Sequence, residues 1–149
     1  MYEIKVRMMN EAMARKLIEP LGLGEPHHVE TATHTYLADP HVTRKIKNDH
    51  GTLSYTIMQR HGAGFTSAVE EISETRAEEL KREYPPRVSL AMTRTVWQEE
   101  GVAIALNVVD KLGVFLEFQG EDFETLKSWP RKIGFSEHHY LTRAYDEIL

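Results

Sequence analysis

The feature of this chain that most constrains its fold is a series of eight short stretches in which apolar and polar residues alternate. In the first of them, YEIKVRM, aromatic and aliphatic residues alternate with charged ones, which is the period-two pattern of a β-strand. The eight stretches cover residues 2–8, 31–37, 42–47, 52–58, 65–73, 89–97, 102–108 and 114–119. Short turn signals separate several of them, and such connections favour hairpins with antiparallel pairing.

Four helical segments are expected between and after these strands. Asn10 is suited to cap a helix that ends before Pro20, because its side chain can accept a hydrogen bond from a free N–H of the first turn. The other helices are expected at residues 75–82, 121–128 and 137–148. We therefore predict an α+β fold in which an eight-stranded antiparallel β-barrel forms a tunnel and the helices pack outside it.

Length and composition exclude several classes of protein. The 149 residues suit a single domain, 1–149, because no long linker or block of like charge divides them. With no cysteine, the chain has no disulfide, thiolate nucleophile or cysteine zinc site. No apolar run reaches the ~20 residues of a membrane span, and residues 1–7 lack a signal-peptide core, so we expect a cytoplasmic protein that binds no membrane. The net charge of −5 argues against nucleic-acid binding.

Charged residues alternate along four of the predicted strands. The side chains that share a face within each strand are Glu3, Lys5 and Arg7; Lys45 and Lys47; Met92 and Arg94; and Glu117 and Gln119. On a single strand such a face usually points to water. In a closed barrel, however, alternate residues of every strand point inward, so four ionic strands together favour a polar lumen.

A lumen with several Lys and Arg and a few Glu suits a phosphorylated ligand. Charge-assisted hydrogen bonds to phosphate are strong where water is partly excluded. Carboxylates in the same cavity can hold Mg²⁺ or Mn²⁺ against phosphate oxygens, because these ions prefer oxygen ligands. The pattern therefore predicts a phosphorylated small molecule as the binding partner.

Several segments resemble the CYTH superfamily, the triphosphate tunnel enzymes that include class IV adenylyl cyclases and thiamine triphosphatases. The most specific is ALNVVDKLGVFLEFQ, residues 105–119, which is similar to the family's pattern of leucine, aspartate, a two-residue gap, leucine, glycine, phenylalanine and glutamate. MYEIKVR resembles the Glu-x-Glu-x-Lys opening, and RKIKNDHG resembles the strand with alternating basic residues. THTYL and MTRTVW resemble two further strands, so the resemblance covers nearly the whole chain.

The resemblance implies roles for seven residues. The phosphate contacts are Lys5, Arg7, Lys45, Lys47 and Arg94, with Lys5 and Arg94 as candidate catalytic groups and Arg7 the weaker assignment. The metal-side carboxylates are Glu3 and Glu117, with one of Glu70 and Glu71 as a weaker addition.

The chain also departs from the family pattern at five positions. Met1 and Thr56 replace a glutamate and a lysine, Met92 replaces the lysine paired with Arg94, and Asn107 and Gln119 stand at an aspartate and a glutamate position. Three negative and two positive charges are thereby lost. Two carboxylates remain for one divalent ion, and the remaining cations suffice for one or two phosphoryl groups.

Three functions follow from these residues. One is an enzyme that hydrolyses or cyclises a nucleoside triphosphate or another organic triphosphate with Mg²⁺ or Mn²⁺. Another is a non-catalytic or repurposed domain that binds a smaller or less charged ligand without the metal. The third is an interaction module that uses the barrel as a scaffold. The barrel edge or the terminal helices could support a homodimer.

Two other signals are assigned no site. The eight histidines lack the i, i+4 spacing that brings two ligands together, and we expect them at the surface. Residues 62–64, Gly-Ala-Gly, join two strands and lack the lysine of a phosphate loop, so we expect a hairpin turn.

Overall fold

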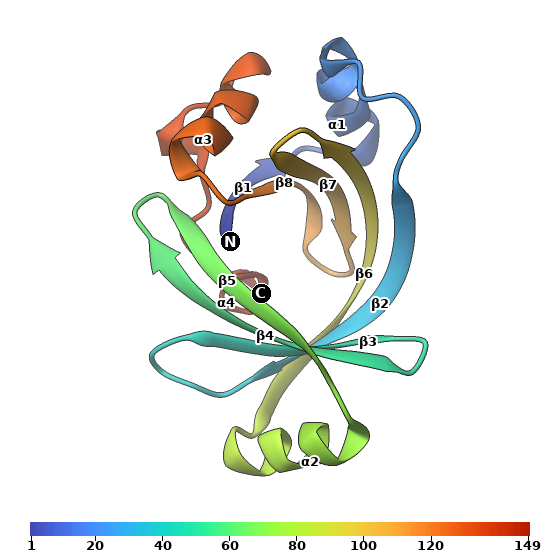
Figure 1. Ribbon diagram of the computed structural model, residues 1–149, viewed down its shortest axis with the longest axis vertical. Coiled ribbons are helices and arrows are strands. Elements are labelled where there is room, and N and C mark those ends of the chain that lie inside the picture. Colours follow the sequence, from blue (N-terminus) through green and yellow to red (C-terminus); the bar gives the residue numbers. More distant parts are fainter.

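Eight antiparallel strands close into one barrel in the computed structural model, which describes residues 1–149 (Figure 1). Around the barrel the strands follow the order β1-β5-β4-β3-β2-β6-β7-β8, and β8 pairs with β1 to complete the circle. The strands are β1 Tyr2–Met8, β2 His28–Leu37, β3 Thr43–Asp49, β4 Thr52–His61, β5 Gly64–Ile72, β6 Pro86–Glu99, β7 Val102–Val109 and β8 Gly113–Gly120. All eight predicted strands are confirmed.

Three helices occupy the outside of the barrel, as predicted. They are α1 Glu11–Ile18, α2 Glu74–Glu83 and α3 Phe123–Lys132. The side chain of Asn10 accepts a hydrogen bond from the N–H of Met13 at 2.8 Å, so this residue caps α1 as expected. In Figure 1, α1 and α3 lie near one end of the molecule and α2 lies at the opposite end. None of the helices has the length and apolar character needed to cross a membrane.

The predicted helix at residues 137–148 is wrong. The segment consists of a 3-10 turn, Glu137–His139, an extended stretch, and the single helical turn α4, Tyr145–Ile148. In the extended stretch Tyr140 bridges to Val6, and the N–H of Leu141 donates to the carbonyl of Lys5 at 2.9 Å. This pairing with β1 overrides the local helical preference, which is a weak determinant by comparison with tertiary contacts.

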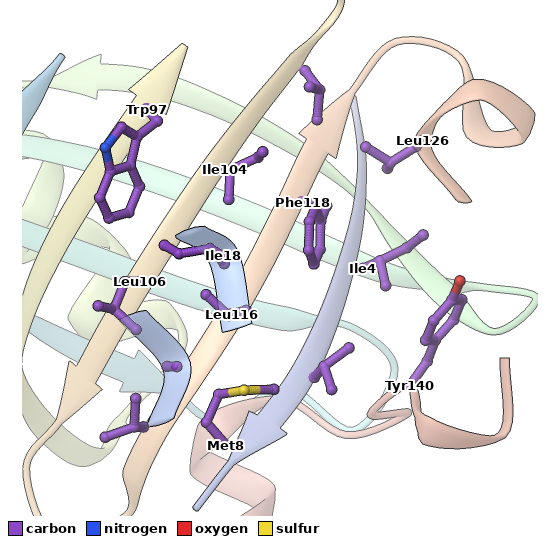
Figure 2. Close-up of a cluster of buried hydrophobic side chains, with 14 residues drawn as sticks. Ile4, Met8, Ile18, Trp97, Ile104, Leu106, Leu116, Phe118, Leu126 and Tyr140 are labelled. Atoms are coloured by element: carbon purple, nitrogen blue, oxygen red, sulfur yellow. The ribbon is translucent and has the colours of Figure 1, made fainter. Parts of the chain in front are cut away.

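The main hydrophobic core lies outside the barrel, between its wall and the helices. Apolar side chains of β1, β7 and β8 point outward here and pack against Ala14 and Ile18 of α1 and Leu126 of α3. Figure 2 shows this cluster, with Ile4, Leu106, Leu116 and Phe118 projecting from neighbouring strands. Because successive side chains of a strand point to opposite faces, this arrangement directs the intervening polar residues into the barrel.

A second apolar cluster lies inside the barrel and fills one end of it. Its buried members are Tyr36, Leu90, Met92, Val109, Phe115 and Tyr145. Tyr145 comes from α4, which is tied to the barrel by an ion pair between Asp146 and Arg87 at 2.7 Å. The prediction that the helices pack outside therefore holds for α1, α2 and α3, whereas α4 inserts a side chain into the lumen.

Gly64 permits closure of the barrel where the pairing is shortest. Strands β1 and β5 pair only at Tyr2 with Thr66 and Glu3 with Phe65. A Cβ atom on Gly64 would lie 2.5 Å from the carbonyl oxygen of Glu3, which is closer than van der Waals contact allows. Both strands would have to separate to admit a methyl group.

We therefore expect Gly64→Ala to lower the free energy of unfolding by about 2–3 kcal/mol, at the upper end of the cost of overpacking. Gly62→Ala is the matched control. Gly62 has open space around it, so only its left-handed φ of +56° disfavours alanine, at a cost of roughly 1 kcal/mol. Urea unfolding of both variants measures the difference. Equal losses would contradict the proposed close approach of β1 and β5.

Candidate functional site

A polar chamber of about 300 Å³ occupies the end of the barrel opposite the inner apolar cluster. Alternate residues from all eight strands line it. The ionisable and amide side chains on its wall are Glu3, His28, Glu30, His34, Lys45, Lys47, Arg94, Gln98, Glu117 and Gln119. The parity of the barrel thus brings together residues that lie far apart in the sequence.

Five of the seven predicted site residues line this chamber: Glu3, Lys45, Lys47, Arg94 and Glu117. The other two lie elsewhere in the barrel, and they are described next. The weaker candidates Glu70 and Glu71 are exposed on β5 and do not line the chamber.

Lys5 is buried beneath the chamber, with 2% of its surface exposed. Its Nζ lies 4.5 Å from the ring centre of Phe65 and 5.0 Å from that of Tyr145, so two aromatic faces stabilise the ammonium group. Arg7 is exposed, and its guanidinium donates to the carbonyl oxygen of Leu112 at 2.8 Å. The structure therefore separates Arg7 from the other predicted phosphate contacts.

Glu117 is the centre of a buried hydrogen-bond network. Arg94 Nη1 donates to its Oε2 at 2.7 Å, and the hydroxyl of Tyr145 donates to its Oε1 at 2.9 Å. Asn107 Nδ2 donates in turn to the Tyr145 oxygen at 3.0 Å. Burial opposes ionisation of Glu117, but Arg94, Lys5 and other nearby cations outweigh it and hold the pKa of this carboxyl well below its usual range. Glu117 is thus held ionised, and each of its two oxygens accepts a hydrogen bond from the protein.

The other two carboxylates of the chamber also bind protein donors. Gln119 Nε2 donates to Glu3 Oε1 at 3.1 Å. Lys47 Nζ lies 3.1 and 3.3 Å from the two oxygens of Glu30. Glu30 was not among the predicted site residues because the second strand was predicted to begin at residue 31, whereas β2 begins at His28 and extends the inward-facing series.

Lys45 differs from Lys47 and Arg94 on the same wall because it has no carboxylate partner, whereas Lys47 pairs with Glu30 and Arg94 with Glu117. Burial lowers the pKa of Lys45 from 10.5 to about 8, although Glu117 partly opposes the effect. Its Nζ lies 5.9 Å from the ring centre of Tyr36. The chamber thus keeps one ammonium group available to an anion.

His34 contradicts the prediction that the histidines lie at the surface, because only 4% of it is exposed. Its Nδ1 is buried without a hydrogen-bond partner. Burial lowers the pKa of His34 to about 2, and the charges of Lys45, Arg94 and Lys47 add to that effect. The period of the strand could have revealed this position, since His34 lies two residues from both Ala32 and Tyr36, which are buried on the same face.

The residues present do not fit a resident Mg²⁺ or Mn²⁺ ion. No group of three or more His, Asp or Glu side chains is placed to hold a metal. Each oxygen of Glu117 already accepts a hydrogen bond, and the guanidinium of Arg94 beside Oε2 would repel a cation there. At two positions where the family resemblance implies carboxylates, Asn107 and Gln119 instead donate hydrogen bonds through their amides. Gln119 thus supplies a neutral donor to the carboxylate of Glu3, and Asn107 supplies one to the hydroxyl of Tyr145.

Comparison with solved structures identifies proteins of the same architecture. A protein of Pyrococcus horikoshii superposes with a TM-score of 0.83 at 22% identity, covering 100% of this chain and 99% of its own. A Bacillus halodurans protein described as a "putative adenylate cyclase" gives a TM-score of 0.70 at 16% identity, covering 97% and 94%. A Hippeastrum protein described with a dominant triphosphatase activity gives 0.65 at 13% identity, covering 97% and 91%.

The chain shares the fold of these proteins. These structures, at 13–22% identity, confirm the predicted barrel fold. No protein-family model matches the chain, and no curated protein matches it in sequence.

The unpaired Lys45 leads to a prediction about stability. Its folded-state pKa, about 8, lies below the ordinary value of 10.5, so below pH 8 folding must hold a charge that the environment disfavours. Between pH 8 and 10.5 the unfolded chain binds more protons, and stability rises with pH. Lys45→Met should therefore raise the free energy of unfolding at pH 7 by about 1–3 kcal/mol, and this gain should shrink towards pH 10.5.

Urea unfolding at pH 7 and pH 10 measures this effect. Lys16→Met is the control, because Lys16 is exposed on α1 and its replacement should change stability little at either pH. A Lys45→Met variant that is less stable than the native chain at pH 7 would show that Lys45 supports the fold rather than straining it.

Proposed function

We propose that the chamber binds a phosphorylated organic molecule with one or two phosphoryl groups, and that it does so without a resident metal ion. The observation that carries this proposal is the contrast between Lys45 and the carboxylates. Glu3, Glu30 and Glu117 each accept hydrogen bonds from protein donors, whereas Lys45 has no carboxylate partner. A partly buried ammonium group without a partner is costly to the fold, and an anionic ligand would supply the missing charge.

The charge of the chamber supports a ligand with few phosphoryl groups. Four cationic side chains, Lys5, Lys45, Lys47 and Arg94, lie in or beneath it, against the three carboxylates, which gives a net charge of +1 with His34 neutral. One phosphate monoester brings roughly −1.5 to −2 charges at pH 7. A triphosphate would bring a larger excess of negative charge, and in a partly desolvated cavity that excess requires additional cations.

A second candidate function is turnover of an organic triphosphate with a divalent metal. Its support is the fold shared with a "putative adenylate cyclase" and with a protein of dominant triphosphatase activity, together with Glu3 and Glu117 on the same inner wall. We rank it second because catalysis of phosphoryl transfer depends on charge neutralisation in place. The carboxylates that would hold the metal already accept hydrogen bonds from Gln119, Arg94 and Tyr145.

We expect inorganic pyrophosphate to bind the purified protein in the presence of EDTA, with no requirement for added Mg²⁺. Lys45→Met should weaken binding at least tenfold, since a charge-assisted hydrogen bond is worth roughly 1.5–3 kcal/mol. Lys16→Met, which removes the same charge from an exposed position, should leave it unchanged. Isothermal titration calorimetry measures all three proteins. Binding that appears only with Mg²⁺ would overturn the proposal.

Turnover is tested separately with ATP, thiamine triphosphate and tripolyphosphate in the presence of Mn²⁺. We expect release of phosphate and pyrophosphate to stay at the level of a Glu3→Ala, Glu117→Ala variant, because the native carboxylates are engaged by protein donors. Release clearly above that control would favour the triphosphatase or cyclase function over metal-free binding.

A further inference from the structure

His34 is the residue of the chamber that neither the resemblance nor the proposed function uses. It lines the cavity from β2, it is almost completely buried, and its Nδ1 has no hydrogen-bond partner. Buried polar atoms in folded proteins nearly always have one, so an exception requires an explanation. Many exceptions of this kind mark places where a ligand or water binds.

The order of the strands places His34 between the cations. Strand β2 lies between β3, which carries Lys45 and Lys47, and β6, which carries Arg94. Lys47 is the direct cross-strand neighbour of His34. Lys45, Arg94 and Lys47 all lie close enough to His34 to influence its charge, so an anion held between Lys45 and Arg94 would lie near the imidazole.

The charged groups that influence His34 come from three strands of the barrel. They are Lys45 and Lys47 of β3, Arg94 of β6 and Glu117 of β8. The three cations can only donate hydrogen bonds, and Glu117 already accepts from Arg94 and Tyr145. Burial and the cations hold the pKa of His34 at about 2, so the ring is neutral at any ordinary pH. A neutral imidazole keeps one N–H donor, and the proton can reside on either nitrogen.

We propose, on the basis of the proposed function, that His34 donates a hydrogen bond from its neutral ring to a phosphoryl oxygen held between Lys45 and Arg94. The ligand that this subsite takes is a phosphoryl or similar tetrahedral oxyanion. Its oxygens can only accept from an N–H, and a neutral donor recognises them without adding a fourth charge to a wall that already carries three. The subsite is then a group of donors on β3, β2 and β6 centred on His34.

The test is ¹⁵N NMR of the native protein with labelled histidine, titrated with inorganic phosphate. Of the eight histidines, His34 is assigned from the signals that disappear in His34→Gln. We expect the ring nitrogens of His34 to shift on saturation while keeping the pattern of a neutral imidazole. Ring signals that do not change at saturating phosphate would overturn the assignment.

Calorimetry of variants gives an independent readout. His34→Phe retains the ring shape without nitrogen and should weaken phosphate binding roughly tenfold. His34→Gln and His34→Asn place an amide N–H near the positions of Nε2 and Nδ1, respectively, and the variant that restores affinity identifies the donating nitrogen. If neither amide restores binding that His34→Phe has lost, the role of His34 is in packing and the assignment fails.

The two proposals fail in different ways. If inorganic phosphate binds neither the native protein nor Lys45→Met, the proposed function is wrong. If phosphate binds the native protein, is lost in Lys45→Met and binds His34→Phe with unchanged affinity, only the subsite on His34 is wrong. Thermal unfolding of each variant verifies that the binding comparison is made between folded proteins.

Discussion

Closure of the sheet is the constraint on which the rest of the structure depends. Once β1 pairs with both β8 and β5, every strand has one face toward the lumen and one toward the outside. In this chain the outward face of β1, β7 and β8 is apolar and is covered by α1 and α3 (Figure 2). The usual relation of core and surface is therefore reversed across the barrel wall, and charged side chains lie inside.

Buried charges of both signs remain stable in this lumen because they satisfy one another. Arg94 and Glu117 form an ion pair, and Tyr145 and Asn107 complete the hydrogen bonds around them. Removing one member of such a network leaves an uncompensated charge, which is more costly than the pair is favourable. Lys5 and Lys45 stand outside this mutual pairing. Two aromatic rings face Lys5, whereas Lys45 lines the chamber, and for that reason its environment is the more informative about a ligand.

Much of the barrel could be predicted from sequence because its signal is local. Alternation along YEIKVRM and the other strands indicated both strand positions and the shared faces of Lys45 with Lys47 and of Glu3 with Lys5. Residues 137–148 could not be predicted in this way, because their conformation depends on pairing with β1. The hydrogen bonds of Glu117 were also beyond reach, since Tyr145 comes from a distant turn that only the folded chain brings into the barrel.

The side chain of Tyr145 also bears on the side from which the proposed ligand would reach the chamber. With Phe115, Met92 and Tyr36 it forms a buried apolar cluster, which lies at the end of the lumen away from the polar chamber. Under the proposed function, a ligand would enter from the other side, with its phosphoryl end leading. The rest of the ligand would then lie beside His28 and Gln98, two exposed lining residues, where the barrel would not restrict its size. Such a site would bind the phosphoryl group and leave the size of the rest of the ligand unrestricted.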